Sequence, residues 1–156
     1  MNKPLKIGLV IVAAIVGDWL LVAGIGSFLT RHKPFAFADG DLPRHVAGRW
    51  DWAGRTHQCD DSAEVITFSP DRRTMTIAMR PHSPADAGWS ATYDILSLTP
   101  GRLRGAIHGE KRLTTDGKPV VWDLVMFSPT EYRWQRTDWP STSYTRAVDR
   151  CPADST

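Results

Sequence analysis

The chain has 156 residues, of which 42% are hydrophobic and 23% charged, and its formal net charge is +2. The first 38 residues carry a net charge of +3, so the remaining 118 carry −1. A near-neutral segment of this length is enough for one domain. The near-neutral charge of this segment excludes the charge-driven binding of nucleic acid that a strongly basic surface gives.

An apolar run near the amino terminus is the most informative feature of the chain. It extends from Ile7 to Leu29 and contains one charged residue, Asp18. About 20 apolar residues are enough to cross a bilayer as a helix. The sequence therefore predicts a cytoplasmic amino terminus at residues 1–6, a transmembrane helix or uncleaved signal anchor at 7–29 and a linker at 30–44.

A cleaved signal peptide is the alternative for this segment. Ala36-Phe37-Ala38 fits the small-x-small pattern that precedes a cleavage site. However, the apolar run is longer than the 7–15 residues that form the core of a signal peptide. Arg31 and Lys33 also lie where a signal peptide is normally uncharged, which favours the anchor.

The predicted span carries features of a helix that packs against another helix. Asp18 lies in its middle, and intramembrane charges are costly and often functional. Small residues that permit close packing lie nearby at Ala13, Gly17 and Gly24. They predict contact with a membrane-protein partner or a self-dimer, with a lone helix carrying a protonated or snorkelling Asp18 as the alternative.

The chain has two cysteines, Cys59 and Cys151, one near each end of the predicted domain. A disulfide between them would close a loop of about 90 residues and stabilise the fold by roughly 4–5 kcal/mol in the chain-entropy model. Disulfides persist in oxidising compartments. The pair predicts a domain in the bacterial periplasm, anchored in the inner membrane by one span; two unpaired thiols in a cytosolic domain are the alternative.

Residues 45–151 show an apolar period of two, which is typical of strands, and residues 152–156 form a short tail. Turn residues separate the strands, and the clearest hairpin is the Asp116-Gly117 pair. The predicted strands are His45–Ala53, Glu64–Phe68, Thr74–Arg80, Trp89–Leu98, Arg102–Glu110, Pro119–Phe127, 132–135 and Ser143–Val148.

About eight strands at this spacing, with no helical segment after the anchor, predict an all-β fold. The expected form is an antiparallel meander that closes into a small barrel or a strongly curved sheet. A two-sheet sandwich is the alternative.

Gly48-Arg49-Trp50 resembles the G-x-W motif that opens the first barrel strand of lipocalins and related calycin proteins. The family's T-D-Y motif has no match, because Thr92-Tyr93-Asp94 holds these residues in another order. The resemblance implies a lipocalin-like barrel with an internal site for a small apolar ligand. It also implies that a late-strand arginine, here Arg146, packs over Trp50.

Aromatic and aliphatic side chains on the predicted strands could line such a site. They are Trp50, Trp52, Met75, Ile77, Met79, Trp122 and Trp134. The alternative is that they fill a solid core, because narrow barrels are packed with side chains.

No catalytic or cofactor-binding motif is present. The densest group of potential metal ligands is His57, Cys59, Asp60 and Asp61, but a metal would need Cys59 as a thiolate. The disulfide excludes that use, so no metal and no cofactor are predicted. Asp123 interrupts an apolar strand and, if buried, needs an arginine partner such as Arg104 or Arg133.

The sequence therefore favours a binding or accessory module that serves another membrane or envelope protein. A lipocalin-like carrier of a small apolar ligand is the second hypothesis. An enzyme is the third, and no residue of the sequence can be named for its catalysis.

Overall fold

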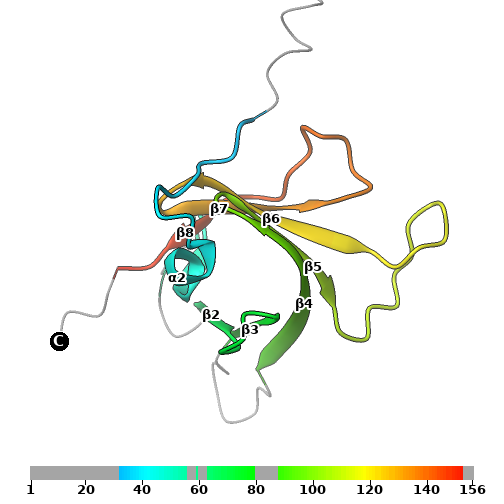
Figure 1. Cartoon of the computed structure of the whole chain (residues 1–156), viewed down its shortest axis with the longest axis horizontal. Helices are drawn as coiled ribbons and strands as arrows, with labels where there is room; N and C mark the ends of the chain where they lie inside the picture. Colours follow the sequence, from blue (N-terminus) through cyan, green and yellow to red (C-terminus); the bar gives the residue numbers. More distant parts are fainter. Residues whose placement is uncertain (1–31, 56–58, 60–62, 80–87, 153–156) are drawn as a thin grey trace, which may run out of the picture. The chain divides into compact units, whose positions relative to one another are not determined.

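The computed structural model describes residues 32–55, 59, 63–79 and 88–152. In this part, eight strands form a closed antiparallel barrel in which each strand pairs with the next and β8 pairs with β1 (Figure 1). The elements are α2 (Leu42–Val46), β1 (Gly48–Trp52), β2 (Glu64–Phe68), β3 (Thr74–Met79), β4 (Trp89–Thr99), β5 (Arg102–Ile107), β6 (Val121–Ser128), β7 (Glu131–Arg136) and β8 (Val148–Arg150). The barrel and its meander order were predicted, and the sandwich alternative is wrong.

The predicted membrane span 7–29 lies outside the described residues, together with Ala13, Gly17, Asp18 and Gly24. Among the residues that are described, no helix is both long enough and apolar enough to cross a membrane.

The segment before the barrel, expected as a linker, contributes to the core. Phe37 is 9% exposed, packs with the core cluster and stacks on His45 with ring centroids 3.9 Å apart. The Phe35 amide donates to the Met126 carbonyl at 2.9 Å, and the backbone at Phe35 lies against Gly101. A Cβ on Gly101 would lie 2.3 Å from the Phe35 carbonyl oxygen, so this close approach requires glycine. Cleavage after Ala38 would remove Phe37 from the core.

A short helix, α2, replaces the beginning of the first predicted strand. The Asp41 side chain accepts a hydrogen bond from the Arg44 amide at its amino end, and Pro43 lies in its first turn. The expectation of an all-strand domain after the anchor is therefore wrong at this point. β1 begins at Gly48, three residues later than the predicted start at His45.

The first and last strands of the barrel are held together by Gly48, Trp50 and Arg150. Gly48 has a φ of +126°, a conformation that side chains other than glycine's rarely adopt. The Trp50 indole is fully buried and donates to the Val46 carbonyl at 2.7 Å. The Arg150 guanidinium lies 5.2 Å from the centroid of the Trp50 ring and donates to the carbonyls of His45 and Ala47. The late-strand arginine is thus Arg150, and the prediction of Arg146, which is exposed, is wrong.

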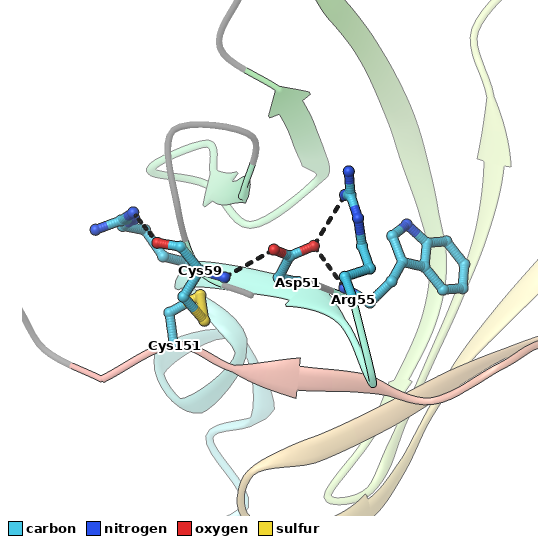
Figure 2. The surroundings of a disulfide bond; sticks show 6 residues. Asp51, Arg55, Cys59 and Cys151 are labelled. Atoms are coloured by element: carbon cyan, nitrogen blue, oxygen red, sulfur yellow. Dashed lines mark hydrogen bonds and ion pairs between the residues drawn. A yellow bond between two sulfur atoms is a disulfide. The ribbon is translucent and has the colours of Figure 1, made fainter. Parts of the chain in front are cut away.

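The predicted disulfide between Cys59 and Cys151 is present, and it ties the loop after β1 to the end of β8. Figure 2 shows Asp51 beside this loop, where its carboxylate accepts from the Cys59 amide at 2.8 Å and from Arg55 at 3.1 Å. Because Asp51 is 1% exposed, these bonds compensate for the burial of its charge.

On β6, Asp123 is buried and has the arginine partner expected of it. Arg104 forms two hydrogen bonds with its carboxylate, at 2.7 and 2.9 Å, and Arg102 contributes a third at 3.3 Å. The alternative partner Arg133 instead binds Glu131.

We predict that replacing both Cys59 and Cys151 with serine lowers the free energy of unfolding by about 4–5 kcal/mol. The disulfide joins residues 92 positions apart, and without it the unfolded chain gains conformational entropy. Urea denaturation of the variant and of the oxidised and reduced wild-type protein measures this. Reduced wild type should match the serine variant. A loss below about 1 kcal/mol would contradict the assignment of the disulfide as a main constraint on the fold.

We predict that Arg150→Lys destabilises the protein by about 2 kcal/mol, because lysine cannot stack on Trp50 while donating to two carbonyls. Arg146→Lys is the matched control, with an expected change within about 0.5 kcal/mol. Urea denaturation of both variants distinguishes the roles of the two arginines, and equal effects would contradict the assignment.

Candidate ligand-binding site

One half of the barrel interior is filled and the other half is hollow. At the α2 end, inward side chains from several strands pack without space, and the largest are Trp50, Tyr132, Met75, Leu103, Leu124 and Met126. Trp50 and Tyr132 pack edge to face, with ring centroids 4.9 Å apart. One inward position further along β1 and β7, Trp52 and Trp134 lie instead in the wall of a cavity.

The cavity has a volume of about 220 Å³ and an apolar lining with a few polar groups. Its walls come from the inward positions of seven strands, β1 to β7, and from two loops. The lining residues are Trp52, Glu64, Ile77, Trp89, Tyr93, Ile107, Arg112, Trp122, Trp134 and Thr145.

Aromatic rings form a connected wall around this cavity. Tyr93 and Trp134 are stacked with centroids 5.2 Å apart, and Trp122 meets Trp134 edge to face at 6.3 Å. Trp139, from the loop after β7, packs against Trp122 at 5.7 Å. These ring contacts give the cavity a continuous aromatic surface.

Glu64 places a carboxylate in the cavity wall. It is the first residue of β2 and shares the inward face with Ile66 and Phe68. Glu64 is only 6% exposed, and the Tyr132 hydroxyl donates a hydrogen bond to its Oε2 at 3.3 Å. Burial raises the pKa of Glu64, and hydrogen bonds from Tyr132 and Trp52 only partly oppose this increase.

Arg112 brings a positive charge to the same cavity, but this charge has a partner. Its guanidinium binds the Glu110 carboxylate through two hydrogen bonds of 2.8 and 2.6 Å and lies 5.5 Å from the Trp122 centroid. The arginine lowers the pKa of Glu110 to about 2, so this pair is ionised at neutral pH. The Glu64 carboxylate, in contrast, forms no salt bridge with any described residue.

Four of the seven residues expected to line a ligand site do line the cavity: Trp52, Ile77, Trp122 and Trp134. Trp50 and Met75 lie in the filled half of the barrel and are fully buried. Met79, at the end of β3, pairs with Glu64 and Trp89 in neighbouring strands but is not part of the lining.

The remaining lining residues were not identified from the sequence. The alternation of apolar residues could have identified Glu64, Trp89 and Tyr93. Each of them lies on the same face of its strand as inward apolar neighbours. Ile107 ends β5 in the same way. Arg112 and Thr145 come from loops, where no periodicity marks the side that faces inward.

The metal alternative at the loop after β1 loses its sulfur ligand, because Cys59 is bonded to Cys151. The other members of that cluster, His57, Asp60 and Asp61, lie outside the described residues. Across the described part of the chain, no three His, Cys, Asp or Glu residues gather closely enough to hold a metal ion.

Compared with known proteins, the chain matches no family model, no curated protein and no solved structure. The functional argument therefore depends on the geometry of the cavity.

We predict that Glu64→Gln raises stability relative to wild type at neutral pH, and that this advantage shrinks as the pH falls. Glutamine can still accept from the Tyr132 hydroxyl but carries no buried charge. Because the folded-state pKa of Glu64 is raised above its usual value of 4.5, the folded wild type binds its proton more tightly than the unfolded chain does.

Ionised Glu64 therefore costs wild-type stability above the raised pKa, and the cost disappears below about pH 4.5. Thermal or urea unfolding from pH 4 to pH 8 measures the difference. A stability difference between the two proteins that stays constant over this range would contradict the raised pKa.

Proposed function

We propose that the barrel is a binding module for a small, mainly aromatic or aliphatic ligand, held in the cavity lined by strands β1 to β7. The observation that carries this proposal is the cavity of about 220 Å³ with an aromatic wall and one buried carboxylate. Ligand sites are typically concave and apolar, with few polar groups that fix the orientation of the ligand.

The barrel architecture supports a carrier similar to the lipocalins. A closed meander of eight strands has an interior just wide enough for side chains or for one small ligand. Gly48 and Trp50 of the G-x-W motif, together with Arg150, seal one end, and this leaves the other end for the ligand. Membership of the lipocalin family is part of this proposal.

The cavity volume restricts the size of the ligand. Pockets for drug-sized molecules measure roughly 300–1,000 Å³, and this one is smaller. It fits a single ring with a short side chain rather than a steroid or a long acyl chain.

We further propose that the domain functions outside the cytoplasm, as the periplasmic part of a protein anchored in the bacterial inner membrane. The disulfide supports an oxidising compartment, and the apolar run at 7–29 supports the anchor. The contact of Ala13, Gly17, Asp18 and Gly24 with a membrane partner or a second copy stays a prediction.

We predict that 2-phenylethanol, a neutral one-ring probe, binds the full chain in detergent with 1:1 stoichiometry, as measured by titration calorimetry. Ile107→Trp should abolish binding, because a larger side chain at this lining position fills the cavity. Leu113→Trp is the matched control: Leu113 is 60% exposed and outside the lining, so binding should persist.

Chemical shifts of the tryptophan indole groups locate the probe. Shifts in Trp52, Trp122 and Trp134 support the proposal. Binding that survives Ile107→Trp, or no binding of any one-ring probe by the wild type, would contradict it.

A further inference from the structure

We infer that the ligand carries a protonated amine, which binds the Glu64 carboxylate while its apolar part lies against the tryptophan rings. This inference rests on the proposed ligand-binding function and names the chemical class of the ligand. The buried carboxylate in the aromatic cavity carries the argument.

Among the described residues around the cavity, one carboxylate, that of Glu64, has no cationic partner. Arg112 and Glu110 neutralise each other across two short hydrogen bonds. Behind the wall, Arg55 binds Asp51 at 3.1 Å. Glu64 has hydrogen-bond donors in Tyr132 and Trp52 but no cation within 4 Å among the described residues.

A buried carboxylate with spare acceptor sites favours a cationic donor. An ionised carboxylate offers about four lone-pair positions, and two neutral donors leave part of them open. Burying an uncompensated charge is costly, and a bound ammonium group removes that cost by forming charge-assisted hydrogen bonds. A ligand carboxylate would instead meet a like charge in a low-dielectric space.

The walls favour the same ligand. Tryptophan faces attract organic cations through the ring quadrupole, most strongly where water is excluded. Trp52, Trp122 and Trp134 surround the space next to Glu64. An amine on a short chain attached to an aromatic ring can reach the carboxylate with its nitrogen while the ring stacks in the apolar part of the cavity.

Three probes of similar size test the charge preference by titration calorimetry at pH 7.5: phenethylamine, 2-phenylethanol and 3-phenylpropionate. We expect the amine to bind about tenfold or more tightly than the alcohol, as a charged hydrogen bond of 1.5–3 kcal/mol implies. The carboxylate should bind most weakly.

Glu64→Gln should reduce amine affinity by about tenfold or more and leave alcohol affinity within about twofold, which also shows that the variant keeps its cavity. Glu131→Gln is the matched control, because it makes the same change of net charge at the partner of Arg133, away from the cavity lining. It should leave all three affinities unchanged.

The wild-type protein gives a test that needs no variant. Amine affinity should fall as the pH decreases through the raised pKa of Glu64, while alcohol affinity stays level. The other titratable groups that act on Glu64 are Tyr132, Tyr93, Asp51 and Arg55, and Arg55 forms its ion pair with Asp51. The pKa of both tyrosines is raised by burial, so both stay neutral in this range.

Failure of this inference is distinguishable from failure of the proposed function. If the alcohol binds as tightly as the amine, or if Glu64→Gln leaves the amine preference intact, the cavity binds ligands but the inference is wrong. Tighter alcohol binding at low pH would mean that protonated Glu64 donates to a neutral ligand, which also overturns it. If none of the three probes binds the wild type, both proposals are wrong.

Discussion

Closure of the barrel at β1 is the constraint on which the other features depend. β1 has only five residues, and it pairs with β2 through Gly48–Trp50 and with β8 through Trp50–Trp52. So short a strand gives little pairing of its own to hold the two ends of the meander together. Arg150 and the disulfide supply the rest: the arginine stacks on Trp50 and binds the backbone beside α2, while Cys59 and Cys151 connect the same two strands covalently. Without this closure, β1 and β8 would be exposed edges.

The same closure explains why the interior is filled at one end and hollow at the other. Trp50 is held at the α2 end by its bond to Val46, and Tyr132 packs against it there, so two large rings and the side chains of α2 occupy that half. Two positions along the strands, the rings of Trp52 and Trp134 stand in the wall instead of the centre. The stacking of Tyr93 on Trp134 keeps those rings in place. The filled end and the packed aromatic wall together define the shape of the cavity.

The sequence predicts the strands well because their alternation is a local property, and β2 was predicted with its correct bounds. Closure was predicted only as one of two forms, a barrel or a strongly curved sheet, because it depends on pairing between strands about a hundred residues apart. The lipocalin resemblance implied Arg146 as the late-strand arginine, but Arg146 lies before β8 and is exposed, and Arg150 takes this position instead. α2 was missed because five residues are too few to show a helical period. Glu64 was missed although the period of two places it on the same face as Ile66 and Phe68, because a charge at the start of an apolar strand is normally solvated.

The position of Glu64 is hard to explain by stability alone. A leucine or a glutamine at this inward site would avoid the cost of a buried charge, and the neighbouring Ile66 and Phe68 show that apolar side chains fit this face. The chain neutralises its other buried carboxylates within the described structure: Asp51 with Arg55 and the Cys59 amide, and Asp123 with Arg102 and Arg104. Among the described residues, Glu64 receives hydrogen bonds from the neutral donors Tyr132 and Trp52, and it lines the cavity. In the part of the chain that the structure describes, this carboxylate has no cation beside it, and it lies in the wall of an aromatic cavity. That is the arrangement expected of a group whose partner arrives with the ligand.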